Sequence, residues 1–84
     1  MTSYIPSDVC STQIDFDLDE SGAVHNVMFT RGCAGNAEGI ARLAEGRSAD
    51  ELIELLKGIP CGTRDTSCPD QLAQALESEL AARS

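Results

Sequence analysis

The chain is 84 residues long, and its fourteen acidic and six basic residues give a net charge of −8 at pH 7. This length allows one small domain. The apolar share of 42% is too high for a disordered acidic tail, and charges interrupt it too often for a membrane span. The acidic balance leaves no basic stripe that could neutralise phosphates, so we expect neither nucleic acid nor an anionic membrane as a partner.

The four cysteines are the most distinctive residues chemically. The first residues carry neither a basic region nor an apolar run, which predicts a cytoplasmic rather than a secreted protein. Disulfides are disfavoured in that reducing compartment, where cysteines more often serve as metal ligands or redox thiols. A core of this size is marginal and is often reinforced by such a staple. In a secreted chain, two disulfides would be the better interpretation.

An antiparallel hairpin is predicted after a loose lead-in over residues 1–9. Residues 13–18 alternate between polar and apolar types, which is the pattern of a half-buried strand. Asp19-Glu20-Ser21-Gly22 is typical of a turn, and residues 24–30 form the return strand.

Three helices are predicted to follow the hairpin. The first begins near Asn36 and ends at Gly46. The second begins at Ser48-Ala49-Asp50-Glu51, which has capping-box spacing, and ends at Gly58. The third carries Pro69 in its first turn. The inward apolar positions of the last two helices are Leu52, Ile53, Leu55 and Leu56, and then Leu72, Leu76 and Leu80. This order predicts an α+β fold, in which three helices cover a two-stranded or slightly larger sheet.

The cysteines fall at the ends of these predicted elements. Cys10 precedes the first strand and Cys33 follows the second at a similar distance from the turn, so antiparallel register brings them together. Cys61 and Cys68 flank the loop between the second and third helices. Cys68 also stands at a helix N-terminus, where the dipole favours a thiolate. If that loop meets the open end of the hairpin, four sulfur atoms converge.

Four thiolates around one ion would form a closed, tetrahedral and therefore structural site. We expect zinc, whose binding would contribute about 10 kcal/mol to folding. The spacing contains no Cys-x-x-Cys pair, and the competing interpretation treats individual cysteines as small core residues. Arg64 and Asp65 either tune the thiolates or are solvated, and Asp70, near the positive end of the third helix, is a further candidate for tuning them.

No catalytic arrangement is recognisable in the sequence. His25 is the only histidine, and it is predicted on the exposed face of the return strand. The glycine-rich turn over residues 32–36 lacks the lysine of a phosphate-binding loop, so we interpret its glycines as letting the backbone curl round a ligated sulfur. We expect no enzymatic activity from the chain on its own.

Thr66-Ser67-Cys68-Pro69-Asp70 is the signature of the TSCPD domain. The chain resembles the stand-alone, four-cysteine branch of that family over nearly its whole length. The other matching positions are Cys10, Gly32-Cys33-Ala34-Gly35-Asn36, Gly58-Ile59-Pro60-Cys61-Gly62 and Gln71-Leu72-Ala73. The resemblance implies a relation to the C-terminal segment of some cobalamin-dependent ribonucleotide reductases. Because 84 residues leave no room for the barrel or the cobalamin pocket of that enzyme, the chain is similar at most to the tail.

A more distant resemblance is to the IscU/NifU iron–sulfur scaffolds, in which a hairpin, a Gly-Cys turn, a helix and a later cysteine follow in the same order. Cys10, Cys33 and Cys68 would correspond to the three scaffold cysteines. Ser11-Thr12 replaces the Gly-Asp that follows the first scaffold cysteine, and Cys61 is an added sulfur. A fourth thiolate in place of an oxygen ligand should hold a metal more tightly, which argues against a donor scaffold.

Together these observations predict a single α+β domain over residues 1–84 that holds one zinc ion through Cys10, Cys33, Cys61 and Cys68. Its expected role is that of a non-catalytic accessory or interaction module with an unidentified protein partner, and a homodimer is open. The alternatives are a carrier of iron or of an iron–sulfur cluster, and a redox-thiol module associated with ribonucleotide reductase.

Overall fold

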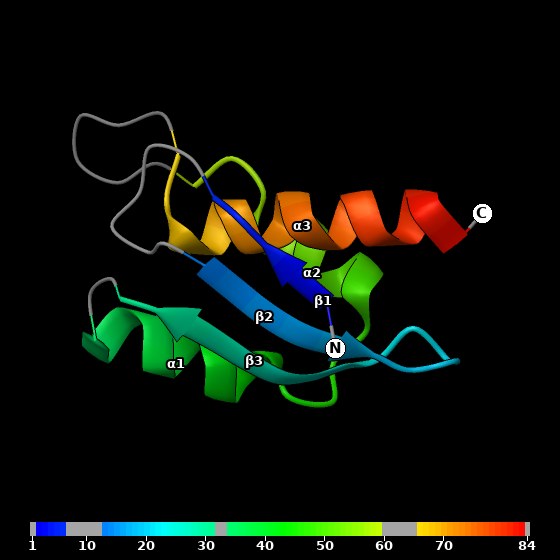
Figure 1. The fold of residues 1–84 in the computed structure, drawn as a ribbon, viewed down its shortest axis with the longest axis horizontal. Coiled ribbons are helices and arrows are strands. Elements are labelled where there is room, and N and C mark those ends of the chain that lie inside the picture. The colour runs from blue at the N-terminus through cyan, green and yellow to red at the C-terminus, as the bar shows by residue number, and fades with distance from the viewer. Residues whose placement is uncertain (1, 7–12, 32–33, 60–65, 84) are drawn as a thin grey trace.

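The structure, a computed structural model, describes residues 2–6, 13–31, 34–59 and 66–83. In these residues an antiparallel sheet of order β1-β2-β3 precedes three helices (Figure 1). The predicted α+β fold is therefore confirmed. The elements are β1 (Thr2–Tyr4), β2 (Gln13–Leu18), β3 (Val24–Thr30), α1 (Ala34–Ala44), α2 (Ala49–Leu56) and α3 (Cys68–Arg83).

The β2–β3 hairpin has the bounds expected from the alternating pattern. Its turn is held by Asp19, whose Oδ1 accepts hydrogen bonds from the backbone N–H groups of Ser21 and Ala23, both at 2.9 Å. Gly22 has a φ of +87°, a backbone conformation that costs glycine little. The turn sets the register, and at the other end of the hairpin Gln13 pairs with Thr30.

A β-bulge in β3 was not predicted. Asp15 pairs with Met28 but Asp17 pairs with His25, so β3 carries one residue more than β2 across this step. Asn26 takes up the extra residue with a φ of +56°, a region that asparagine tolerates better than most residues. The bulge lets Val24 and Val27 both be buried although they are three residues apart.

The expectation of a loose lead-in over residues 1–9 was wrong for its first part. β1 pairs antiparallel with β2, and Ser3 lies opposite Asp15. Three residues are too few to show a period, so the neighbouring edge of β2, and not the local sequence, determines this strand. Residues 7–9 lie outside the described residues.

The starts of α1 and α2 lie close to the positions predicted from the sequence. α1 begins at Ala34, two residues before the predicted position, and Gly46 follows its end with a φ of +79°. Ser48 caps α2, because its Oγ accepts a hydrogen bond from the N–H of Glu51 at 3.1 Å. The Glu51 carboxylate accepts a hydrogen bond of 2.7 Å from Arg47. It therefore does not make the second bond of the predicted capping box, which would run from the backbone N–H of Ser48 to Glu51.

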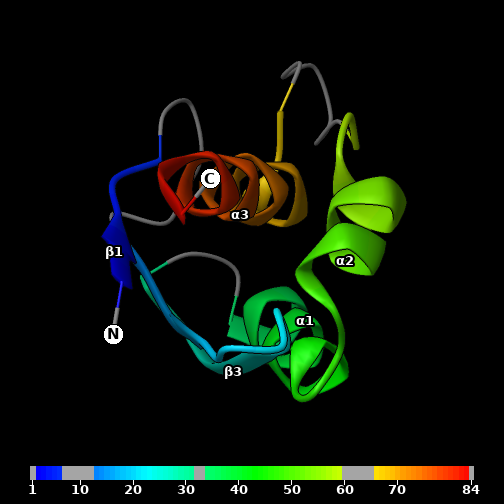
Figure 2. The same ribbon diagram turned by 90° about the vertical axis from the view of Figure 1, so that its right-hand side faces the viewer.

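All three helices lie on one side of the sheet (Figure 2). Leu72 and Leu76 are fully buried as predicted, and Leu80 packs beside the core. Leu55, predicted to face inward, is instead 59% exposed. The opposite side of the sheet carries polar groups such as Ser3 and Asp15, which are hydrogen-bonded to each other. The core residues are Ile14, Phe16, Val24, Val27, Ala44, Ala49, Leu52, Leu72, Ala75 and Leu76.

Candidate functional site

Of the four predicted metal ligands, the structure describes Cys68. It is the first residue of α3 and only 7% exposed. Cys10, Cys33 and Cys61 lie outside the described residues, as do Arg64 and Asp65. Within the described residues, no three His, Cys, Asp or Glu side chains are grouped so that they could hold a metal ion. The four-cysteine centre therefore stays a prediction.

The described residues nearest to Cys10 and Cys33 show where the chain enters and leaves the described structure at these two cysteines. Gln13 is the third residue after Cys10, Thr30 is the third before Cys33, and the two pair with each other at the open end of the hairpin. Arg31, with a φ of +61°, turns the backbone directly after β3. The starts of β2, α1 and α3 and the end of β3 all lie at one end of the molecule (Figure 1).

The end of α2 is tied to the same place by a buried carboxylate. The backbone N–H of Gly58 donates a hydrogen bond of 2.6 Å to Oδ1 of Asp70, in the first turn of α3. Lys57 also pairs with Glu77 at 2.9 Å, although this pair is largely exposed and therefore weak. Gly58, three residues before Cys61, is thus hydrogen-bonded to the helix that begins with Cys68.

The first turn of α3 is capped by its neighbours in the TSCPD run. The Oγ of Ser67 accepts a hydrogen bond from the N–H of Asp70 at 3.2 Å, which makes Ser67 the N-cap. Thr66 donates its hydroxyl hydrogen to Oδ2 of Asp70 and accepts a hydrogen bond of 2.8 Å from Nε2 of Gln71. Gln74 donates a further bond, of 2.9 Å, to Oδ2 of Asp70.

Asp70 is consequently a structural centre of the motif. Its side chain is nearly inaccessible, with 4% of the residue exposed. Burial alone would raise the pKa of this carboxyl, but hydrogen bonds from Thr66, Gly58 and Gln74 favour the charged form and lower the pKa below its ordinary value. The carboxylate joins the end of α2 to the start of α3, a structural role that the local sequence does not indicate.

Sequence reasoning could have found part of this network. Ser67 and Asp70 have the same three-residue spacing as Ser48 and Glu51, the pair that was used to predict the start of α2. The bond from Gly58 has no local signal, because it joins residues twelve positions apart.

His25 belongs to a separate ionisable cluster at the turn end of the hairpin. Its Nε2 lies 2.8 Å from Oδ2 of Asp19, and its Nδ1 lies 2.5 Å from Oε2 of Glu45, just beyond α1. The bonds to Glu45 and Asp19 raise the pKa of the imidazole above its ordinary value, because both carboxylates favour the charged form. The side chain remains 35% exposed. The cluster joins the β2–β3 turn to the end of α1.

The fold and the capped α3 start therefore define a small α+β domain built around the TSCPD run. The model of the TSCPD domain matches residues 2–80, nearly the whole chain, and the chain belongs to this family. Neither the curated proteins nor the solved structures compared with the chain gave a match. The predicted family is confirmed, while the likeness to the IscU/NifU scaffolds stays a prediction. Among the described residues, no helix is long and apolar enough to cross a membrane.

Proposed function

We propose that the protein is a non-catalytic metal-binding module in which Cys10, Cys33, Cys61 and Cys68 hold one zinc ion. The observation that carries this proposal is the position of Cys68. Cys68 is buried at the start of α3. The described segments that lead toward the other three cysteines end at the same end of the molecule (Figure 1).

The length of the backbone supports this assignment. An extended chain spans about 3.5 Å per residue, so Cys10 lies within about 10 Å of Gln13, and Cys33 lies within about 10 Å of Thr30. Gln13 and Thr30 are paired. Cys61 follows Gly58 by three residues, and Gly58 is hydrogen-bonded to Asp70, two residues after Cys68. These short tethers are compatible with a single four-sulfur centre.

The donor set favours zinc and a structural role. Four thiolates suit tetrahedral zinc and leave no open position for a substrate. The N-terminus of α3 supplies a positive dipole end beside Cys68, which stabilises the thiolate form that a metal requires. Such a site would supply the folding energy that an 84-residue core lacks, and it suits a reducing, cytoplasmic environment.

The test is the zinc content of four single variants, each with one cysteine replaced by serine. We expect each replacement to lower the zinc per chain by more than half and to reduce thermal stability by a similar large amount. Ala75→Ser is the matched control, because Ala75 is a small, buried residue of the same helix with 2% exposure. It should keep its zinc even if it is destabilised.

The same samples distinguish the alternatives. Visible absorption of anaerobically purified protein would indicate an iron–sulfur cluster in place of zinc. Loss of stability in the Cys61 and Cys68 variants alone, with no metal in the parent protein, would favour a redox-thiol pair.

A further inference from the structure

His25 holds two carboxylates at once at the turn end of the hairpin. Its Nε2 lies 2.8 Å from Oδ2 of Asp19, in the β2–β3 turn, and its Nδ1 lies 2.5 Å from Oε2 of Glu45, directly after α1. A charged carboxylate only accepts hydrogen bonds, so both ring nitrogens must donate, which requires the protonated imidazole. A neutral imidazole has one N–H and can keep only one of the two bonds. One proton therefore separates two arrangements of this cluster.

The two carboxylates are not equally free to leave. Oδ1 of Asp19 accepts hydrogen bonds from the N–H of Ser21 at 2.9 Å, from its hydroxyl at 2.7 Å and from the N–H of Ala23 at 2.9 Å. Within the described residues, Glu45 has one further bond, of 3.0 Å, from the N–H of Asn26 to its Oε1, and its side chain is 52% exposed. The single N–H of a neutral ring therefore stays with Asp19, and Glu45 is the group released.

Release of Glu45 follows from the geometry of the neutral ring. With its N–H on Nε2, the ring turns the lone pair of Nδ1 toward Oε2 of Glu45, and the two acceptors repel each other. The carboxylate can move away because a shallow hollow lies between β3 and α1. The hollow is lined by Asn26, Val27, Glu38, Ala41, Arg42 and Glu45. Once Glu45 has moved, the N–H of Asn26 in the β3 bulge loses its acceptor.

The other charged groups around the ring do not replace its proton. Asp17 of β2 lies opposite His25 in the sheet, and its negative charge favours the protonated ring. Arg83 of α3 bonds to two carbonyl oxygens at the start of the turn. Arg42 forms its ion pair with a glutamate one turn earlier in α1. Among the described residues, His25 is thus the cation that is paired with Glu45.

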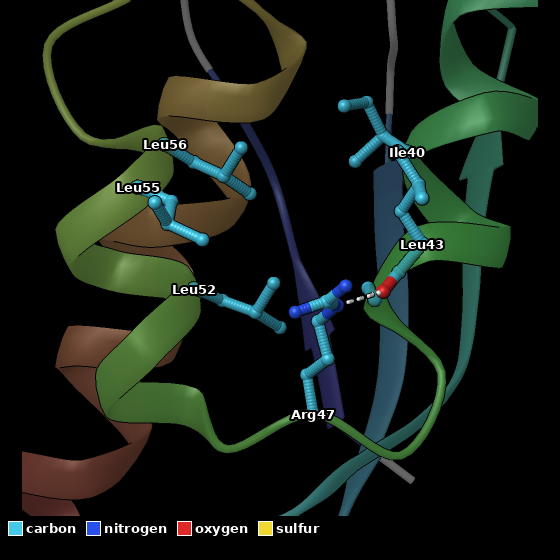
Figure 3. Close-up of a pocket in the computed structure, with 7 residues that line it drawn as sticks. Ile40, Leu43, Arg47, Leu52, Leu55 and Leu56 are labelled. Carbon is cyan, nitrogen blue, oxygen red and sulfur yellow. Dashed lines mark hydrogen bonds between the residues drawn. The ribbon is translucent and has the colours of Figure 1, made fainter.

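The connection between α1 and α2 is held independently of the ring. The N–H of Gly46 donates a hydrogen bond of 2.7 Å to the carbonyl oxygen of Val24, and the N–H of Val24 donates one of 2.8 Å to that of Arg47. Figure 3 shows Arg47 in the apolar pocket between α1 and α2, where its Nε donates a hydrogen bond of 2.8 Å to the carbonyl oxygen of Leu43. Loss of the ring proton leaves these bonds in place.

We propose that His25 is a proton-operated latch on the bulge of β3. The protonated ring holds Glu45 over the N–H of Asn26, and loss of the ring proton releases Glu45 and exposes this N–H to water. Both carboxylates raise the pKa of the ring above 6.5, so the latch is closed below pH 6.5 and opens as the pH rises through the raised pKa. The response is local to the contact between β3 and the end of α1.

The experiment measures by NMR how fast backbone amide protons exchange with water, corrected for the intrinsic pH dependence of exchange. Between about pH 5.5 and about pH 9, we expect the protection of the Asn26 amide to fall about tenfold, with the midpoint at which the His25 ring titrates. The amides of Val24 and Gly46 should keep their protection. Equal protection of Asn26 at both ends of this range would overturn the proposal, and so would an equal loss at Val24 and Gly46.

Glu45→Gln should reverse the sign of the effect. The glutamine NH₂ can donate to the lone pair of the neutral Nδ1 while its oxygen accepts from the N–H of Asn26, but it cannot satisfy both groups when the ring is protonated. Protection of Asn26 should therefore rise with pH in this variant. A fall like that of the parent protein would overturn the proposal.

Glu38→Gln is the matched control. Glu38 is also an exposed glutamate, but it lies within α1 and pairs with Arg42 and not with His25. This variant should show the same fall in Asn26 protection as the parent protein. Both replaced side chains are more than half exposed, so both variants should fold, and circular dichroism checks this. Loss of the pH response in Glu38→Gln would contradict the assignment of the latch to His25 and Glu45.

Discussion

The backbone N–H of Gly58 donates a 2.6 Å hydrogen bond to the buried carboxylate of Asp70, and this contact joins the end of α2 to the start of α3. The two residues belong to two of the runs that carry the family resemblance, Gly58–Gly62 and Thr66–Asp70. The contact therefore explains why an aspartate ends the TSCPD run, independently of any metal.

Replacing Asp70 with alanine should destabilise the protein by about 2 kcal/mol, the usual loss for hydrogen bonds to a charged group. The N–H of Gly58 and the hydroxyl of Thr66 would lose their acceptor. Urea unfolding measures the effect. Glu54→Ala is the control, because Glu54 is an exposed carboxylate on α2 and its removal should change stability by less than about 0.5 kcal/mol. Equal effects of the two variants would contradict the role given to Asp70.

The pH dependence of stability should carry a contribution from His25. A neutral imidazole has one N–H, so it cannot donate to both Asp19 and Glu45, whereas the protonated ring can. Because the folded-state pKa of His25 is raised above 6.5, its stabilising effect is fully present below pH 6.5. The effect is lost as the pH rises through the raised pKa.

The urea midpoint of the parent protein and of His25→Gln, measured as a function of pH, tests this. The difference between the two should be largest on the acidic side of pH 6.5 and should shrink as the pH rises through the folded-state pKa. A difference that is constant with pH would show that the protonated ring does not act as described.

The bulge in β3 gives a third prediction. Asn26 has a φ of +56°, a region in which a side chain branched at Cβ is strained. Asn26→Val should therefore lower the free energy of unfolding by about 2 kcal/mol. Asn26→Gly should lower it clearly less. Both variants lose the bond of 2.9 Å from Asn26 to Asp17, so their difference isolates the backbone term. Thermal unfolding of the two variants measures it. If valine were tolerated as well as glycine, the left-handed conformation would not be required.

The elements that the sequence predicted well are those encoded by local patterns. The alternation in residues 13–18, the turn at Gly22 and the cap at Ser48 each depend on residues a few positions apart. These patterns are visible without knowing the tertiary structure. The β2–β3 hairpin and the order of the helices followed from such patterns, and the family followed from the run Thr66–Asp70.

What the sequence did not reveal depends on distant contacts. β1 forms because the edge of β2 is available to it, and the bulge at Asn26 is needed to bury two valines with an odd spacing. Leu55 is exposed because α2 packs on α3 and leaves an open apolar pocket between α2 and α1. At the candidate site, the position of Cys68 at the start of a helix could be predicted from the sequence. Whether the other three cysteines lie beside it depends on segments outside the described residues.

Metal analysis of freshly and anaerobically purified protein tests the proposed centre most directly, when it is combined with a visible spectrum. We predict one zinc ion per chain and a colourless solution. A chain that is fully folded and cooperative in unfolding while containing neither zinc nor iron would contradict the proposed function.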